Sequence, residues 1–366
     1  MTTNTEPKFL ALRPLLPTAD ELYPYLKKID ENRYYANFGP LVEEVHDRCA
    51  QWLNLEERKH VMTASSGMAI LELLIQAYDI PLGTTAIMPS WTYIATPHAA
   101  LNKGLVPYFV DVDPVSWALT PEIAEKAMRD APGDVSLIMP VAPFGLPLPV
   151  QEWEDFSRRH NVRVIIDGAA MCLDDVVPSE TVPTMVSFHA TKMLNAAEGG
   201  LLIIKDQDIT LRVKKMSHFG TNKKGIFWNA TNAKMSEYHA AVLLASMDAW
   251  PKSKSDFIRV AKGYHAGFTG ASNIKLRPGY GEDRFNSVCM IEHKGMDLEK
   301  LLDLGVETRH WWRHACHNEP LFSTIARGDL PVTDHLAEFT VGLPVHKDFT
   351  ADDVAEICEK VLLCEA

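Results

Sequence analysis

A lysine in the stretch SFHATKMLNAAEGG follows directly on an apolar run. Burial at such a position lowers the pKa of an amine, and the neutral amine can form a Schiff base with an aldehyde. Ser187 and His189 offer hydrogen-bond donors suited to a phosphate, and Gly199 and Gly200 allow a tight return into the next strand. A solvated lysine on a surface loop is the plainer interpretation of Lys192 alone, since most lysines are exposed.

Three further positions have side chains or backbone groups that could bind the other parts of an aldehyde-bearing ligand held by such an amine. Asp167 ends the run VRVIID, and a carboxylate beside a pyridine nitrogen keeps that nitrogen protonated, whereas an ordinary strand end also favours Asp. Ser65, Ser66 and Gly67 precede a helical pattern, which describes either an anion cradle or a plain strand-to-helix turn. Trp91 could stack on a flat heteroaromatic ring or pack in the core.

Together these four parts describe a site for pyridoxal 5′-phosphate. This cofactor needs an amine for its aldehyde, an acid for its ring nitrogen, a cradle for its phosphate and a wall for its ring. The sequence contains no GxxxxGK[ST] string and no GxGxxG string, so it offers neither a P-loop nor a dinucleotide fingerprint. The six cysteines form no Cys-x-x-Cys pair, and we predict no metal site.

The motifs extend along nearly the whole chain. In order they are NFGPLVEEVHDRCAQWL, TASSGMAILELL, PSWTYIATPHAAL, FVDVDP, VIIDGAA, SFHATKMLNAAEGG, NAKMSEYHAAVLLASMD, GVETRHWW and GLPVHKDFT. In these strings the sequence resembles the DegT/DnrJ/EryC1/StrS family of sugar aminotransferases. The resemblance implies an α/β fold of type I, like that of aspartate aminotransferase. A large domain around a mostly parallel sheet would be followed by a small α+β domain.

The resemblance also implies roles for individual residues. Lys192 and Asp167 would be catalytic: the lysine would hold the aldehyde, and the aspartate would pair with the ring nitrogen. Asn232 would reach a phosphate in the neighbouring subunit of a homodimer with shared active sites, although a cap on a helix starting near Lys234 is equally consistent. The residues implied to bind the cofactor are Ser66, Gly67, Met68, Trp91, Asp167, Ser187, His189, Lys192 and Asn232.

Two positions depart from the family pattern. Met68 stands where the family commonly has Thr, so a hydroxyl contact to the phosphate is lost while the backbone N–H remains. Ala170 stands where Gln or His is frequent, which removes a contact to the ring hydroxyl. The retained Lys192 favours transamination, because relatives that replace this lysine with His dehydrate the sugar instead.

The reaction implied is amino transfer from L-glutamate to a nucleotide-linked keto-6-deoxy sugar, such as a dTDP-4-keto-6-deoxy-hexose. Such sugars serve surface polysaccharides, including O-antigen and lipopolysaccharide, or natural products. The string NAKMSEYHAA differs from the NSRxDxxQAA pattern of C3 enzymes, which favours C4. A C3 aminotransferase, a pyridoxal phosphate-dependent sugar dehydratase or lyase, and a non-enzymatic regulatory relative remain alternatives. Arg309, His310, Trp311 and Trp312 either bind the nucleotide or form a structural cluster.

The order of segments indicates how these residues are positioned. Short apolar strands are expected at 60–63, 85–88, 108–110, 135–141, 162–166, 185–189 and 201–204, separated by helical patterns. Such runs are typical of a parallel sheet covered on both faces, whose ligands bind beyond the carboxyl ends of the strands. A helix over 234–250 is expected to stop at Pro251, and the pattern then changes. We therefore predict a large domain at 1–245 and a small domain at 246–366.

Composition narrows the class of protein. The 366 residues are 46% hydrophobic and 23% charged, with a formal charge of −12, which indicates a folded chain and disfavours nucleic acid or anionic membrane as a general partner. Prolines interrupt the two long uncharged stretches, 80–102 and 135–151, so neither should span a membrane. The sparse cysteines and the absence of a signal-like pattern in residues 1–24 lead us to expect free thiols and a cytoplasmic protein.

Overall fold

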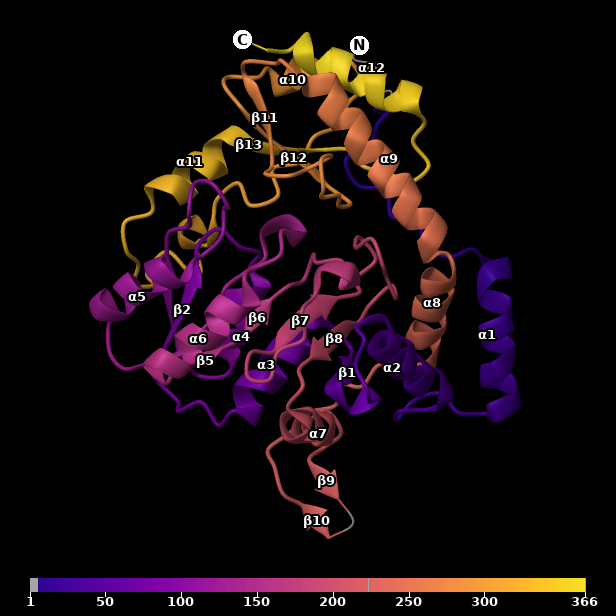
Figure 1. The fold of residues 1–366 in the computed structure, drawn as a ribbon, viewed down its shortest axis with the longest axis vertical. Coiled ribbons are helices and arrows are strands. Elements are labelled where there is room, and N and C mark those ends of the chain that lie inside the picture. Colours follow the sequence, from indigo (N-terminus) through magenta and orange to yellow (C-terminus); the bar gives the residue numbers. More distant parts are fainter. Residues whose placement is uncertain (1–5, 223, 366) are drawn as a thin grey trace. The chain divides into compact units, whose positions relative to one another are not determined.

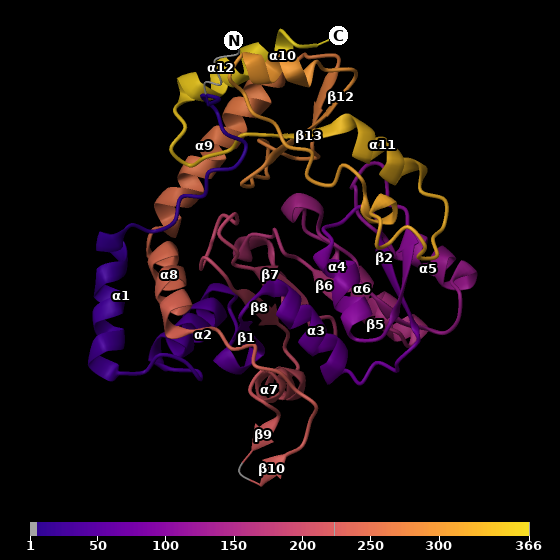
Figure 2. The same ribbon diagram turned by 180° about the vertical axis from the view of Figure 1, so that it is seen from behind.

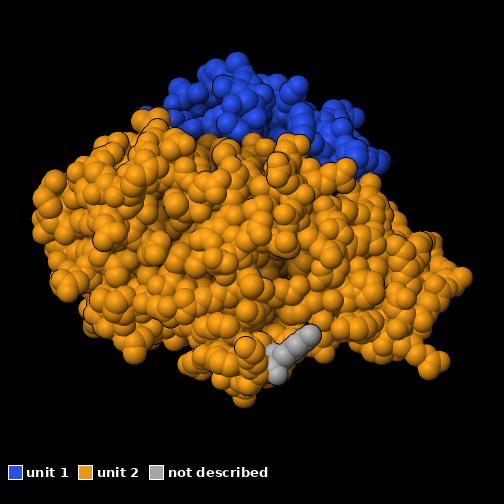
Figure 3. Space-filling view, turned by 60° about the horizontal axis from the view of Figure 1, so that its bottom comes forward, with its two compact units in different colours: residues 1–15, 249–314, 334–366 blue, residues 16–248, 315–333 orange. Residues whose placement is uncertain are grey.

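The computed structural model describes residues 6–222 and 224–365. It separates into two compact units, coloured in Figure 3: unit 1 comprises Met1–Leu15, Ala249–His314 and Asp334–Ala366, and unit 2 comprises Leu16–Asp248 and Ala315–Thr333. Neither unit is one continuous stretch of sequence: residues 6–15 belong to unit 1, and Ala315–Thr333 belongs to unit 2. The backbone N–H of Phe9 donates to the carbonyl of Gly305, whereas that of Cys316 donates to the carbonyl of Ser90. The division into functional domains at 245/246 stays a prediction.

Unit 2 is built around two linked four-stranded sheets, with strand orders β3-β2-β4-β5 and β1-β8-β7-β6 (Figures 1 and 2). All pairs are parallel except β1–β8 and β7–β8. A bridge between Val141 and Asp167 joins the sheets, so the mainly parallel α/β architecture is confirmed. The strands are β1 (Val61–Ala64), β2 (Thr85–Pro89), β3 (Val106–Val110), β4 (Val135–Ile138), β5 (Arg163–Val164), β6 (Ile166–Asp167), β7 (Thr184–Ser187) and β8 (Gly200–Ile203).

Helices cover these sheets, and a short hairpin projects beyond α7 (Figure 1). The helices of unit 2 are α1 (Ala19–Asn32), α2 (Pro40–Trp52), α3 (Gly67–Ala77), α4 (Ala95–Asn102), α5 (Pro121–Asp130), α6 (Val150–His160), α7 (Gln207–Met216) and α8 (Glu237–Asp248). The hairpin consists of β9 (Thr221–Asn222) and β10 (Gly225–Ile226), and short 3₁₀ turns lie at Arg58–His60, Pro143–Gly145, Leu173–Asp175 and Cys316–Asn318.

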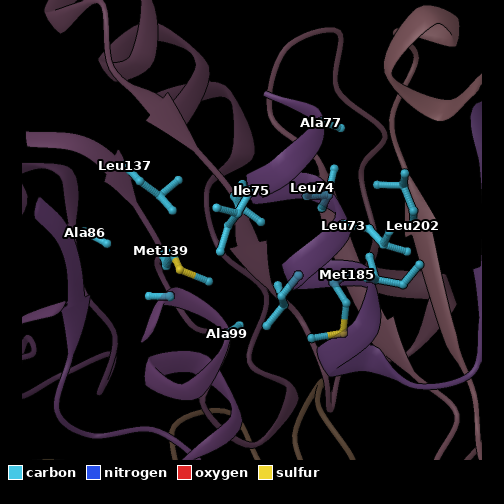
Figure 4. Close-up of a cluster of buried hydrophobic side chains, with 14 of the residues drawn as sticks. Leu73, Leu74, Ile75, Ala77, Ala86, Ala99, Leu137, Met139, Met185 and Leu202 are labelled. Atoms are coloured by element: carbon cyan, nitrogen blue, oxygen red, sulfur yellow. The ribbon is translucent and has the colours of Figure 1, made fainter. Parts of the chain in front are cut away.

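A buried apolar cluster fixes α3 against the strands. Leu73, Leu74 and Ile75 of α3 lie among Met185 of β7 and Leu202 of β8 (Figure 4). Each of these side chains is at most 2% exposed. Burial of one such side chain is worth about 1.5–3 kcal/mol, so this cluster holds the start of α3 firmly at the strand ends.

Unit 1 combines an antiparallel sheet with helices. The sheet has the order β11-β12-β13, formed by β11 (Ile274–Leu276), β12 (Cys289–His293) and β13 (Thr340–Leu343). Its helices are α9 (Trp250–Phe268), α10 (Leu298–Asp303) and α12 (Ala351–Leu362), while α11 (Pro331–Phe339) crosses the border between the units in the sequence. Thr350 caps α12 in a capping box, as its position in the sequence indicates.

One predicted helix boundary is wrong. Instead of a single helix over 234–250 that stops at Pro251, α8 ends at Asp248 and α9 begins at Trp250 with Pro251 in its first turn. Proline is tolerated there because the first N–H groups of a helix have no intrahelical acceptor.

The structure also bears on the expected free thiols and on the expected absence of a membrane span. The six cysteines are free and buried. Among the described helices, none combines the length and the apolar character that a membrane span requires. Residues 1–5, which belong to the segment in which we expect no secretory signal, lie outside the described residues.

Candidate active site

Asp167 lies at the carboxyl end of β6 with both carboxylate oxygens engaged. Oδ2 accepts a hydrogen bond from Oγ1 of Thr96 at 2.7 Å, and Oδ1 accepts one from the backbone N–H of Ala169 at 3.1 Å. The side chain is 4% exposed, and burial raises the pKa of Asp167, which the two hydrogen bonds and the charge of Lys192 partly oppose. This carboxylate is therefore held in one orientation inside the unit.

Lys192 follows β7 on the turn that leads to β8. Its backbone N–H donates to the carbonyl of His189 at 2.9 Å, which fixes the turn. Burial lowers the pKa of the Lys192 amine, while the charge of Asp167 opposes the shift. Lys192 is half-buried, so it is not a fully solvated surface lysine, and its lowered pKa favours the neutral, nucleophilic form.

The start of α3 forms a cradle of backbone donors. Oγ of Ser66 accepts the N–H of Ala69 at 3.1 Å, whereas the N–H groups of Gly67 and Met68 belong to the first helical turn, which has no intrahelical acceptors. A Cβ added to Gly67 would lie 2.7 Å from Sδ of Met185, so glycine is required there. The positive end of the helix dipole adds to the attraction for an anion.

Ser187 and Gly200 complete this cradle from the neighbouring strands. An added Cβ at Gly67 would lie 3.4 Å from Cβ of Ser187, which places that hydroxyl beside the cradle. A Cβ at Gly200 would lie 2.5 Å from the carbonyl oxygen of Ser66, so Gly200 allows close backbone approach. The chain returns into β8 at Gly199 and Gly200 as expected, and the positive φ of the turn, 65°, belongs to Ala197.

Trp91 and His189 differ in their surroundings. Trp91 follows β2, is 1% exposed, and has its ring 6.2 Å from that of Phe144 at 63°. His189 is exposed: Nδ1 lies 2.9 Å from Oγ1 of Thr191, and Nε2 lies 3.6 Å from the Glu198 carboxylate. The tryptophan therefore belongs to the interior of unit 2, whereas the histidine lies at the surface next to Ser187.

Asn232 is the one predicted site residue that the chain does not bring to this cluster by any described contact. It is exposed, forms an antiparallel bridge with His218, and its Oδ1 accepts a hydrogen bond from Nζ of Lys234. The capping alternative is wrong, because α8 begins at Glu237 and Oγ of Ser236 accepts the N–H of His239.

Sequence reasoning missed two threonines that connect Trp91 to Asp167. Oγ1 of Thr92 lies 2.9 Å from Oγ1 of Thr96, and both side chains are buried. Thr92 lies on the bend before α4 and Thr96 lies in the first turn of that helix, so no helical spacing in the sequence identifies the pair. The hydroxyl groups of Thr92 and Thr96 therefore form a row of hydrogen bonds that ends at Asp167.

In unit 1, Arg309 and Trp311 form a compact pair. The guanidinium lies 4.6 Å from the centre of the Trp311 ring, and Nδ1 of His310 lies 3.1 Å from the carbonyl of Thr340. A Cβ added to Gly342 would lie 2.6 Å from Nε1 of Trp311. This packing favours the structural interpretation of the cluster. The side chain of Arg309 is exposed.

The residues of unit 2 fit pyridoxal phosphate. They supply an amine of lowered pKa, a buried carboxylate within its electrostatic reach, and a cradle of backbone N–H groups at the start of α3. Within the described ranges, no group of three or more His, Cys, Asp or Glu side chains is arranged to hold a metal ion.

Comparison with known proteins agrees with this chemistry. The model of the DegT/DnrJ/EryC1/StrS aminotransferase family matches residues 18–362. The dTDP-4-amino-4,6-dideoxy-D-glucose transaminase of Shigella dysenteriae is 29% identical over 248 residues, which are 66% of this chain and 65% of that protein.

Two solved structures extend the similarity to the whole fold. A putative PLP-dependent aminotransferase from Bacillus cereus has a TM-score of 0.88 at 26% identity, over 97% of this chain and 100% of that chain. The structure of DesI, determined in the presence of its TDP-sugar product, has a TM-score of 0.87 at 27% identity, over 98% of this chain and 93% of that chain. The fold thus agrees with that of PLP-dependent aminotransferases.

Proposed function

The chain belongs to the DegT/DnrJ/EryC1/StrS aminotransferase family, and we propose that it transfers the amino group of L-glutamate to a nucleotide-linked keto-6-deoxy sugar. One observation carries the proposal: Lys192 and Asp167, each shifted by burial toward its neutral form, lie within electrostatic reach at the carboxyl ends of β7 and β6. Buried acid–base pairs of this kind mark catalytic sites more often than structural ones.

Pyridoxal phosphate, when bound, supplies an aldehyde that takes up the amino group and a ring that accepts electrons from the substrate carbon. Lys192 would hold that aldehyde and then, once displaced, take a proton from the substrate carbon and return it, which its lowered pKa favours. Asp167 would keep a proton on the ring nitrogen. Trp91 would exclude water from one face of the ring.

The phosphate would lie against the N–H groups of Gly67 and Met68, with Ser66 and Ser187 beside it. Met68 offers only its backbone there, and the short side chain of Ala170 leaves the ring hydroxyl without a long polar partner at that position. His189 would face the substrate. We therefore expect the cradle at the start of α3 to contribute most of the phosphate affinity.

Asn232 would complete the site of a second copy of the chain. It lies exposed near the projecting hairpin, where Phe219, Ile226 and Phe227 are 53%, 75% and 56% exposed. Exposed apolar side chains gathered in one segment favour burial against a partner. We propose a homodimer with shared active sites, in the cytoplasm, where free thiols persist.

A dTDP-linked 4-keto-6-deoxy-hexose is the preferred sugar. The dTDP-sugar transaminase from Shigella and DesI with its TDP-sugar product support this choice, and NAKMSEYHAA departs from the C3 pattern. The product would enter surface polysaccharide or natural-product sugars.

The proposal is tested by adding L-glutamate to the pyridoxal phosphate-loaded protein and following its visible absorbance. Loss of the band with release of 2-oxoglutarate is expected, and an unchanged spectrum would refute amino transfer from glutamate. Supplying dTDP- and UDP-linked 3-keto and 4-keto sugars next, with the products identified by NMR, distinguishes C4 from C3 amination. Sugar conversion without consumption of glutamate would indicate the dehydratase or lyase.

A further inference from the structure

Thr92 and Thr96 engage the acid of the site although neither belongs to its predicted residues. We propose that these two hydroxyl groups form a directional relay that orients Asp167 and keeps it ionised toward the cofactor. Both are positioning residues, since they act through Asp167. The inference rests on the proposed function, because the ring nitrogen that Asp167 serves belongs to pyridoxal phosphate.

The direction of the relay follows from counting protons. An ionised carboxylate only accepts hydrogen bonds, so the single proton of the Thr96 hydroxyl points to Oδ2 of Asp167, at 2.7 Å. The contact of 2.9 Å between Oγ1 of Thr96 and Oγ1 of Thr92 must then use the proton of Thr92, in preference to the longer contact of 3.4 Å from Thr92 Oγ1 to the carbonyl of Tyr93. A chain of donors oriented this way polarises each bond and strengthens the last one.

The relay matters because Asp167 lies in an unfavourable place for a charge. Burial raises its pKa, and the hydrogen bond from Thr96 is the largest of the effects that lower it again. The backbone N–H of Ala169 and the amine of Lys192 are the other groups that favour the ionised form. Without the Thr96 hydroxyl, the ionised form of the carboxylate would be less favoured, and only the N–H of Ala169 would hold its orientation by a hydrogen bond.

A segment distant in the sequence anchors the relay. The carbonyl of Ser90 accepts the N–H of Cys316 at 2.9 Å, and Oγ of Ser90 accepts the N–H of His317 at 3.0 Å. Oγ of Ser90 also forms a hydrogen bond with Nδ1 of His317, at 2.8 Å. Because Ser90, Cys316 and His317 are all buried, they fix the backbone from which Trp91 and Thr92 extend.

The chain provides a matched control for Thr96. Thr333 is equally buried, and its hydroxyl donates to Oδ1 of Asp111 at 2.7 Å, the same distance as in the Thr96–Asp167 bond. Asp111 also accepts the N–H groups of Val332 and Thr333, so this pair caps α11. Thr333→Val therefore removes the same type of bond from a place with no predicted catalytic role.

The experiment measures the pH titration of the visible absorbance in pyridoxal phosphate-loaded wild type, Thr96→Val, Thr96→Ser and Thr333→Val. A carboxylate that has lost a hydrogen-bond donor is more basic and would draw the proton from the ring nitrogen to itself. The ring would then carry less positive charge, so groups conjugated to it would keep their protons to higher pH. We expect the midpoint to rise by about one pH unit in Thr96→Val, a tenfold change in proton affinity. Thr96→Ser should restore the wild-type midpoint, and Thr333→Val should leave it unchanged.

Each other outcome has a definite meaning. An unshifted midpoint in Thr96→Val, or an equal shift in Thr333→Val, overturns the relay. If the wild type itself gains no visible band with pyridoxal phosphate, the proposed function fails, and the inference fails with it. Should Thr96→Val not fold, Thr92→Val is used, for which a smaller rise is expected and an unchanged midpoint contradicts the proposal.

Discussion

Two regions of unit 2 bury an acid and a base, with different consequences. The strand-end site contains Asp167 and Lys192. The second region, which we call the α2 anchor, contains Glu237 of α8 and His46 of α2. Glu237 and His46 are 1% and 3% exposed, and burial raises the pKa of Glu237 and lowers that of His46 to about 3. Both regions therefore disfavour charge.

The partners of these groups differ. Glu237 accepts the N–H groups of Leu41 and Val42 at 2.8 and 3.0 Å, and Nε2 of His46 accepts the N–H of Thr63 at 3.0 Å. Backbone donors thus satisfy both side chains of the α2 anchor. In the described parts of the chain, by contrast, no hydrogen bond reaches Nζ of Lys192. The amine of Lys192 therefore differs both from the α2 anchor and from Asp167, whose carboxylate accepts two fixed hydrogen bonds. An amine without a fixed partner is available for chemistry.

Lys192→Ala is the strongest test of this difference. Removing the amine should abolish the visible band that the wild type gains with pyridoxal phosphate and lower turnover by at least about 1,000-fold, since a general acid–base group contributes about 10²–10⁴-fold. The measurement is 2-oxoglutarate release from L-glutamate. Lys205→Ala, which breaks only the surface pair with Glu180, serves as control and should keep full activity. Wild-type turnover in Lys192→Ala would remove the lysine from the mechanism.

Asp167→Asn removes the negative charge of the carboxylate while nearly keeping the size and shape of the side chain. We expect turnover to fall by about 100-fold, the effect of removing one electrostatic contact to the reacting system. Because burial raises the native pKa of Asp167, the folded protein without cofactor binds this proton more tightly than the unfolded chain. Its stability therefore falls as pH rises from the unfolded pKa through the native one.

The asparagine variant lacks this proton, so its unfolding free energy should be flatter across that window. Chemical denaturation of the cofactor-free protein at several pH values measures the slope. An identical pH dependence in both proteins would show that the pKa of Asp167 is not shifted by burial.

The sequence predicts the strand-end site better than the α2 anchor. Asp167 and Lys192 follow apolar runs, and parallel strands bring such ends together, so their proximity follows from local pattern. Glu237 lies in a helix where a charged residue normally faces solvent. Nothing local indicates that it meets the start of α2, because Leu41 is 196 residues away in the sequence.

Other features also depend on contacts that local pattern does not record. Thr96 reaches Asp167 across 71 residues, and His317 bonds to Ser90 across 227. A proline such as Pro251 in a helical pattern either ends one helix or lies in the first turn of the next. Only the tertiary structure distinguishes the two.

His46→Gln tests the base of the α2 anchor. Because the native pKa of His46 is about 3, the folded protein refuses the proton that the unfolded chain accepts below its ordinary value of 6.5. This residue therefore costs stability as pH falls from 6.5 toward 3, by up to about 1.4 kcal/mol per pH unit. Glutamine can accept the Thr63 N–H without titrating, so the acid-side slope should become shallower while turnover at pH 8 is retained. A slope equal to that of the wild type would contradict the burial of a neutral His46.

Glu237→Gln tests the acid of the same region and should have the smallest effect. The amide oxygen keeps one of the two bonds to Leu41 and Val42, so the unfolding free energy should fall by about 1 kcal/mol, the net worth of one hydrogen bond. Since burial raises the native pKa of Glu237, the wild type is favoured most below the unfolded pKa of Glu, and its advantage shrinks as pH rises through the native value. Denaturation at pH 4 and pH 8 measures both the loss of unfolding free energy and its dependence on pH. The absorbance of bound pyridoxal phosphate should not change. A spectral shift as large as that of Asp167→Asn would mean that the α2 anchor is coupled to the cofactor, and the two regions would then form one functional unit.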